Sequence, residues 1–208
     1  MDVLAALKNV PVIAILRSRD ATRLTEVSTV LAESGITAIE FTLTTAGAIE
    51  ALREYAKAKP ASVVLGAGTV LDADMAEAAV EAGATYLITP ALRPAVVDAA
   101  KRLDVPVIPG ALTPTEILTA WESGVSAVKV FPAPLVGGPE YLKAVLAPLR
   151  HIPLVPTGGV GVDDAADYLA AGATAVGIGT PLTGDALEGG SLAALRERAE
   201  RVVANVSG

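Results

Sequence analysis

A fourfold repeat constrains the fold of this chain more than any other feature of its sequence. A small residue, a glycine, two further residues and an apolar run recur as ESGITAIE, EAGATYLI, ESGVSAVK and AAGATAVG. The glycines Gly35, Gly83, Gly124 and Gly172 are 48, 41 and 48 residues apart. Glycine is typical of the position just after a helix, so each phrase predicts a helix that ends shortly before a strand. Repeats of this period indicate a closed or stacked architecture.

Eight short runs rich in valine and isoleucine predict the strands. Each run is apolar on both faces, which is typical of parallel strands that are buried on both sides. Stretches rich in alanine, leucine and glutamate, of helical character, separate the runs. The runs occupy residues 11–17, 38–43, 62–69, 86–90, 106–111, 127–132, 153–159 and 175–180.

The repeat and the runs together predict an α/β protein with a closed sheet. Two βα units in each of four repeats are what a (β/α)8 TIM barrel requires. We therefore expect residues 1–208 to form a single (β/α)8 barrel domain, with a short extra helix near residues 2–8. A doubly wound open sheet is the alternative. It would not predict the fourfold phase, and the GxGxxG turn typical of that fold does not follow the first strand.

Composition excludes several classes of function. The 208 residues include no cysteine and one histidine, which excludes disulfides and thiolate metal sites and leaves little room for histidine-based metal or hydrolase chemistry. The net charge of −7 argues against binding to nucleic acid or to an anionic membrane. The mean hydropathy of +0.52 is high, but the longest stretch without charge contains glycines and a proline and is shorter than a typical membrane span. We expect a cytoplasmic protein that needs no metal or other cofactor.

The repeat also predicts which side chains point into the barrel. The residues five positions after the four glycines occupy equivalent places on alternate strands, and such residues form one layer of a barrel interior. This layer consists of Glu40, Ile88, Lys129 and Gly177. Two alternatives remain open: Glu40 and Lys129 form a structural ion pair, or the strand parity is wrong and Lys129 faces the helices. Apolar residues often replace a buried ion pair without loss of stability, so we favour a functional role.

A lysine and a glutamate in an apolar chamber predict a specific chemistry. Of the six lysines, Lys129 alone lies inside an apolar strand. Burial lowers the pKa of an amine, and a neutral amine attacks a carbonyl to form an imine. Glu40 is a suitable base for moving protons to and from substrate hydroxyls. We therefore expect Lys129 and Glu40 to be catalytic.

Glycine-rich turns at the ends of the last two strands predict a phosphate site. Loops after the seventh and eighth strands of such barrels often bind phosphate through backbone N–H groups. The candidate residues are Gly158 and Gly159 after one strand, and Gly179 and Thr180 after the other. Arg17, at the end of the first strand, suits a carboxylate or a phosphate.

The third strand ends in the sequence Gly66-Ala67-Gly68-Thr69. Glycines in a strand let a ligand approach the backbone closely, so we expect a ligand here. The Thr69 hydroxyl is a suitable donor to a substrate carboxylate.

Eight motifs in order resemble a known family. The segments PVIAILR, IEFTLTT, GAGTV, ITP, PGALTPTE, KVFPA, PTGGV and GIGT are similar to those of the 2-keto-3-deoxy-6-phosphogluconate (KDPG) aldolase and 4-hydroxy-2-oxoglutarate (KHG) aldolase family of class I aldolases. The resemblance covers residues 10–185. It implies a homotrimeric barrel that cleaves a phosphorylated 2-keto acid, KDPG, to pyruvate and glyceraldehyde 3-phosphate.

The resemblance also implies roles for individual residues. The family's Schiff-base lysine falls on Lys129 and its general base on Glu40. Its other substrate-binding positions fall on Arg17, Thr69, Pro90, Phe131, Thr157, Gly158, Gly159 and Thr180. Some members hold the substrate carboxylate with an arginine four residues after the base, and here that residue is Thr44. The sequence thus leaves open what holds the carboxylate.

Several alternatives to this function remain open. KHG, the galactonate epimer of KDPG and a sulfonated analogue are other substrates for the same mechanism. An isomerase or synthase barrel that binds a phosphorylated ligand would use Lys129 and Glu40 only as polar contacts. A phosphosugar sensor would bind its ligand without turnover.

Overall fold

The computed structural model describes residues 3–207, and each predicted apolar run contains a strand within them. The fifth run contains two short strands because Pro109, which has no backbone N–H to donate, separates them. The strands are β1 (Val12–Leu16), β2 (Ala38–Thr42), β3 (Val64–Gly68), β4 (Leu87–Ile88), β5 (Val107–Ile108), β6 (Gly110–Ala111), β7 (Val128–Val130), β8 (Leu154–Pro156) and β9 (Val176–Ile178).

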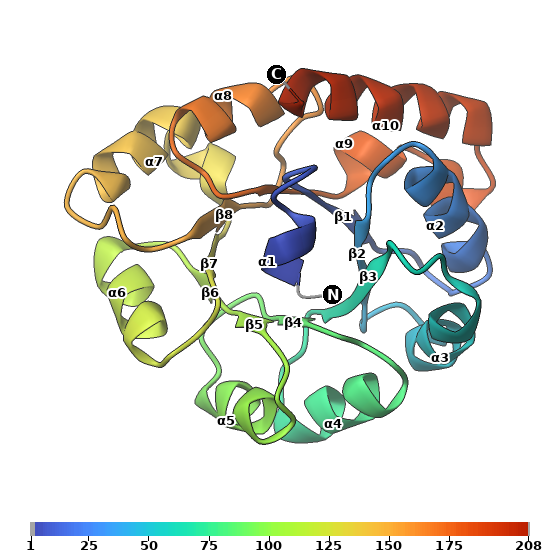
Figure 1. The fold of residues 1–208 in the computed structure, drawn as a ribbon, viewed down its shortest axis with the longest axis horizontal. Helices are drawn as coiled ribbons and strands as arrows, with labels where there is room; N and C mark the ends of the chain where they lie inside the picture. The colour runs from blue at the N-terminus through green and yellow to red at the C-terminus, as the bar shows by residue number, and fades with distance from the viewer. Residues whose placement is uncertain (1–2, 208) are drawn as a thin grey trace.

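The strands form two sheets in which every pair is parallel. One sheet has the order β5-β4-β3-β2-β1-β9 and the other the order β6-β7-β8. An isolated bridge between Thr157 and Gly177 joins β8 to β9. Figure 1 shows the strands curled around a common centre. The expected parallel α/β architecture is confirmed, but the strands are divided between two sheets rather than forming one continuous eight-stranded sheet.

Helices cover the outer side of the curled sheets, and the helix that follows each strand lies beside it (Figure 1). Among residues 3–207, no helix is long and apolar enough to cross a membrane. The outer helices are α2 (Leu24–Glu33), α3 (Ala48–Ala58), α4 (Ala73–Glu81), α5 (Pro94–Arg102), α6 (Pro114–Glu122), α7 (Gly138–Leu146), α8 (Ala165–Ala170), α9 (Thr180–Thr183) and α10 (Leu192–Val206), with 3-10 turns η1 (Ala133–Val136) and η2 (Ala186–Glu188).

The four repeated glycines end helices, as their spacing predicts. Gly35, Gly83, Gly124 and Gly172 have φ angles of 97°, 107°, 76° and 102°, the left-handed region that glycine adopts without a steric penalty. After three of them, the next residue donates its N–H to the carbonyl five residues earlier, which is the hydrogen bond of a Schellman motif. The repeat is therefore a series of helix ends, each placed just before a strand.

Two separate apolar cores lie on the two sides of the strands. The larger core joins the outward side chains of the strands to the surrounding helices. The smaller core lies inside the curl, where α1 (Val3–Ala6) packs against inward side chains of the strands. Figure 1 places α1 in the middle of the strands. The expected extra helix is thus present, although Asp2 lies outside the described residues. Helix α1 fills the interior at the amino-terminal ends of the strands.

Candidate active site

The structure places Glu40 and Lys129 on the inner side of the strands. Glu40 of β2 is paired in register with Ile15 on one side and Gly66 on the other. Lys129 of β7 lies between Gly110 and Val155. Glu40 is 1% exposed and Lys129 is 5% exposed. Ile88, from the same expected layer, belongs to the inner apolar core, so Lys129 does not face the helices.

Glu40 and Lys129 are close enough to interact electrostatically but do not form an ion pair. Among the described residues, the ion pairs with an N–O distance within 4.0 Å join other side chains at the surface. The Lys129 amine instead lies over the Phe131 ring, 5.0 Å from its centroid. Lys129 and Glu40 therefore do not form the structural ion pair that was one of the alternatives, and no carboxylate lies within 4.0 Å of the Lys129 amine.

Burial shifts the pKa values of both groups toward their neutral forms. Burial lowers the pKa of Lys129, the Glu40 carboxylate opposes this, and the Arg17 guanidinium lowers it further. Burial raises the pKa of Glu40, and the positive charges of Lys129 and Arg17 oppose that rise. A buried amine with a lowered pKa supplies more neutral nucleophile at a given pH than an exposed lysine does.

Glycines of β3 make room for side chains from neighbouring strands. A Cβ atom on Gly68 would lie 1.5 Å from Oε1 of Glu40, and a Cβ atom on Gly66 would lie 2.3 Å from the Tyr86 ring. Both distances are impossible for non-bonded atoms. The expectation that these glycines admit a ligand to the backbone is therefore wrong, because protein side chains occupy the space above them.

The glycine beneath Glu40 gives a testable consequence. Replacing Gly68 with alanine should force the Glu40 carboxylate out of its position, because the new methyl group would occupy it. We expect the variant to lose about 100-fold or more in kcat/KM, the range of a displaced general base. Steady-state kinetics and circular dichroism check this. Gly189→Ala is the control, since Gly189 is exposed, lies outside the pocket that Lys129 lines and has nothing within 4 Å of its Cβ position. Equal activity of Gly68→Ala and the wild type would contradict the expectation.

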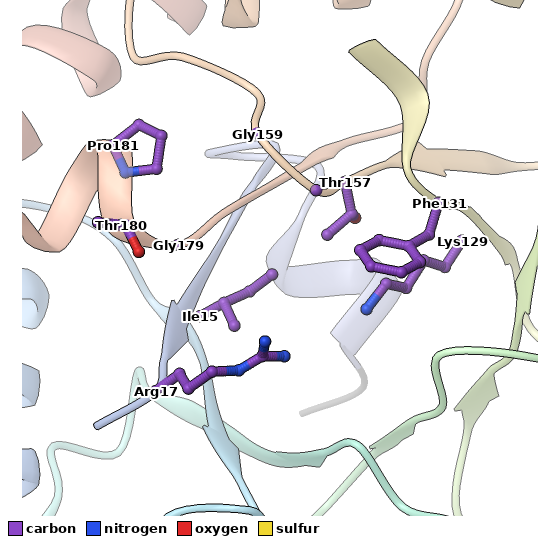
Figure 2. A pocket seen from close by; sticks show the side chains of 10 residues that line it. Ile15, Arg17, Lys129, Phe131, Thr157, Gly159, Gly179, Thr180 and Pro181 are labelled. Carbon is purple, nitrogen blue, oxygen red and sulfur yellow. The ribbon is translucent and has the colours of Figure 1, made fainter. Parts of the chain in front are cut away.

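Lys129 and Arg17 extend into one pocket at the carboxyl ends of the strands. Figure 2 shows the amine and the guanidinium pointing into the same space. Its volume is about 220 Å³, which suits a small metabolite rather than a larger ligand. The residues that line it are Ile15, Arg17, Lys129, Phe131, Thr157, Gly158, Gly159, Gly179, Thr180 and Pro181.

Two turns form the wall of the pocket opposite Arg17. Gly158 and Gly159 follow β8 with φ angles of 94° and 106°, and a Cβ on Gly158 would lie 2.6 Å from the Phe131 ring. Glycine is therefore required there by backbone conformation and by contact. Gly179 precedes α9 and Thr180 begins it. Both turns expected to bind phosphate thus meet at one pocket, although they follow different strands (Figure 2).

Three expected site residues do not line this pocket. Glu40 is buried and does not reach the pocket surface. Pro90 lines a neighbouring cavity together with Phe131. Thr69 lies at the end of β3 with a φ of 56°, an uncommon and strained conformation for a β-branched residue. Thr44 is exposed.

Sequence reasoning missed two residues of the pocket, Ile15 and Pro181. Ile15 lies two positions before Arg17, so strand alternation was a signal that would have found it. No sequence pattern indicated Pro181. Within residues 3–207 there is no group of three or more histidine, cysteine, aspartate or glutamate side chains that could hold a metal ion.

Comparisons with known proteins agree on one family. The family model described as KDPG and KHG aldolase matches residues 3–197. The 2-dehydro-3-deoxy-phosphogluconate aldolase of Haemophilus influenzae is 38% identical over 82% of this chain and 78% of its own length. The enzyme of the same name from Pseudomonas aeruginosa is 40% identical over 77% of this chain and 71% of its own.

A solved structure adds a chemical comparison. KDPG aldolase from Legionella pneumophila, with pyruvate captured as a covalent carbinolamine intermediate, superimposes with a TM-score of 0.88. It is 27% identical, and the match covers 96% of this chain and 97% of that one.

Proposed function

This chain belongs to the KDPG and KHG aldolase family, and from that premise we propose that it cleaves KDPG to pyruvate and D-glyceraldehyde 3-phosphate through an imine on Lys129. As an aldolase it is a carbon–carbon lyase. The observation that carries the proposal is the buried Lys129 amine, which opens onto a pocket and has no carboxylate bound to it. An amine held in this way serves as a nucleophile toward a ketone.

The first half of the reaction forms the imine. The neutral Lys129 amine attacks the C2 ketone, and the resulting carbinolamine loses its oxygen as water. The product is a protonated imine, whose positive nitrogen withdraws electrons from the adjacent carbon atoms. Glu40 moves the protons that these steps require, because it is the one buried carboxylate among the described residues and its charge acts on the amine.

The second half breaks the carbon–carbon bond. Glu40 accepts the C4 hydroxyl proton, the C3–C4 bond breaks, and its electron pair passes into the imine to form an enamine. Glyceraldehyde 3-phosphate leaves with its new aldehyde group. The enamine then takes a proton at C3, and water hydrolyses the imine to release pyruvate and the free amine. Glu40 begins and ends this cycle as a carboxylate.

The pocket wall supports binding of the substrate phosphate. Gly158, Gly159, Gly179 and Thr180 supply backbone N–H groups and one hydroxyl around the pocket that Lys129 enters. Arg17 supplies positive charge at the same mouth and suits a phosphate or a carboxylate. We assign Thr157 and Phe131 to the walls around the reacting carbons. Thr69 and Pro90 stay as proposed pyruvate contacts from the neighbouring strand ends.

Substrate preference tests the phosphate assignment. KHG, the galactonate epimer and a sulfonated analogue are alternative substrates of the same mechanism. We expect kcat/KM for KDPG to exceed that for KHG, which has no phosphate, by roughly 10- to 100-fold, the worth of one or two charge-assisted hydrogen bonds. Coupled assays of pyruvate release on all four substrates measure this ratio. Equal or higher kcat/KM for KHG would overturn the phosphate assignment and leave the imine mechanism intact.

Two further rivals make a different prediction. An isomerase or synthase that uses the same pocket forms no imine, and a phosphosugar sensor binds without turnover. Both predict that borohydride in the presence of pyruvate leaves the protein mass unchanged, whereas the aldolase gains a pyruvyl adduct. The family membership favours the aldolase.

We propose that the two sheets close into a complete (β/α)8 barrel and that residues 1–208 form one domain. The bridge between Thr157 and Gly177 and the hydrogen bond from Thr174 N to Leu154 O support closure at β8 and β9. At the other junction, Lys129 N donates to the Pro109 carbonyl. We further propose a cytoplasmic homotrimer, as the family resemblance implies, and exposed apolar side chains such as Leu135, 81% exposed, are compatible with contacts between subunits.

A further inference from the structure

Two buried polar atoms inside the curl of strands have no hydrogen-bond partners among the described residues. In the part of the chain that the structure describes, the Tyr86 hydroxyl and the Glu40 Oε2 atom are both buried, and neither has a partner. Tyr86 is 0% exposed. An unpaired buried polar group destabilises the folded state, more so when it is charged, so both atoms require an explanation.

The two side chains lie over the same strand. The Tyr86 ring covers Gly66, and its Cζ atom, which bears the hydroxyl, is 2.3 Å from the position of a Cβ there. The Glu40 carboxylate covers Gly68, with Oε1 only 1.5 Å from the corresponding position. Residues two apart on one face of a strand are about 7 Å apart. The phenol and the carboxylate therefore lie over alternate residues of one strand, close enough for the Glu40 charge to act on the Tyr86 hydroxyl.

We propose that Tyr86 is a positioning residue whose hydroxyl donates a hydrogen bond to the Glu40 carboxylate, directly or through one bound water. The bond holds Glu40 in the orientation in which its other oxygen faces Lys129. The catalytic part of this role rests on the proposed function, because Tyr86 can affect turnover only if Glu40 is the general base. The hydrogen bond itself does not depend on the reaction.

Packing alone does not account for a tyrosine at this position. A phenylalanine ring would fill the same space above Gly66 without burying a hydroxyl. The inner core around Tyr86 is otherwise built from aliphatic side chains. A hydroxyl buried there, close enough to Glu40 for the carboxylate charge to act on it, is explained by donation to that carboxylate.

The charged groups around Glu40 determine how the Tyr86 hydrogen bond should change the pKa of Glu40. Arg17, which follows β1, and Lys129 of β7 act on Glu40 with positive charge. β3 places Gly66 and Gly68 beneath the two side chains, and Tyr86 immediately precedes β4. Burial and the Glu40 charge raise the pKa of Tyr86 well above 10, so the phenol keeps its proton and acts only as a donor. A hydrogen bond to the ionised carboxylate lowers the pKa of Glu40.

The test compares Tyr86→Phe with Tyr55→Phe in the full-length protein. Tyr55 is the matched control because it is also a buried tyrosine, 2% exposed. However, its ring stacks on Phe41 in the outer core. Infrared spectroscopy follows titration of the Glu40 carboxyl group, assigned by the band that Glu40→Gln removes. We expect Tyr86→Phe to raise the Glu40 pKa by about one unit, the equivalent of one hydrogen bond. Tyr55→Phe should leave it unchanged.

Kinetics supply a second readout. The acid limb of kcat/KM against pH should move upward by the same amount in Tyr86→Phe, with a roughly 10-fold loss of kcat and little change in KM. An unchanged Glu40 titration in Tyr86→Phe, or an equal shift in Tyr55→Phe, would overturn the proposal. If the wild type cleaves none of the four substrates, the proposed function fails, and the infrared titration still decides the role of Tyr86.

Discussion

Replacing Lys129 with alanine should remove both turnover and covalent trapping of pyruvate. The variant lacks the amine that forms the imine, so no electron sink exists for cleavage of the C3–C4 bond. Losses of about 10⁴- to 10⁶-fold in kcat are typical when a covalent nucleophile is removed. Borohydride reduction with pyruvate, followed by mass spectrometry of peptides, should place the pyruvyl adduct on Lys129 in the wild type and find none in the variant.

The matched control is Lys143→Ala. Lys143 is an exposed lysine of α7 that pairs with Glu140 on the surface, and such a pair contributes less than about 1 kcal/mol. This variant should trap pyruvate and turn over as the wild type does. Trapping in Lys129→Ala at the wild-type level, or an adduct on another lysine, would refute the assignment of the nucleophile.

Replacing Glu40 with glutamine should cost about 10²- to 10⁴-fold in kcat, the usual contribution of a general base. The amide fills nearly the same space but accepts no proton from the C4 hydroxyl or the carbinolamine. Stopped-flow measurement of imine formation and steady-state cleavage both report the loss. Aldol cleavage at the wild-type rate in this variant would mean that another group moves the protons.

The same substitution should make the folded protein more stable near neutral pH. Burial raises the pKa of Glu40 in the folded state. The stability that this protonated group contributes is therefore present below the pKa of the unfolded chain and is lost as pH rises through the folded-state pKa. Glutamine carries no charge at any pH, so the gain in the free energy of unfolding should grow across that interval. Denaturant unfolding of both proteins at several pH values measures it.

A gain in stability with a loss of activity would identify Glu40 as a functional group. Glu50→Gln is the control, because Glu50 lies in the first turn of α3, outside the interior, and its substitution should change neither quantity greatly. A destabilised Glu40→Gln protein would instead indicate that the charge supports the fold.

Much of the fold was readable from local sequence patterns. The eight apolar runs and the glycines at the helix ends are local properties, since each depends on a few neighbouring residues and on the period of the element that contains them. The fourfold phase then ordered these elements. The division of the fifth run was not anticipated, although the cause is also local, because Pro109 interrupts it.

The inner layer of the site was predictable for the same reason. Side chains alternate along every strand, so one reference glycine in each repeat was enough to put Glu40 and Lys129 inside. The turns after β8 and β9 were also found from their glycines, and they line the pocket with Lys129. Thr69 was proposed from its place at the end of the third strand and Pro90 from the resemblance, and neither residue lines that pocket.

Local sequence patterns were enough to predict the order of the elements and which side of each strand faces inward, because both follow from periods of two and 3.6 residues along the chain. The way in which inward side chains from different strands share the interior became visible only in the folded structure. That the space above Gly68 belongs to Glu40, that Tyr86 covers Gly66 and that Lys129 is not bound to Glu40 depend on strand stagger and rotamers. These are relations between residues far apart in sequence, which no local pattern records.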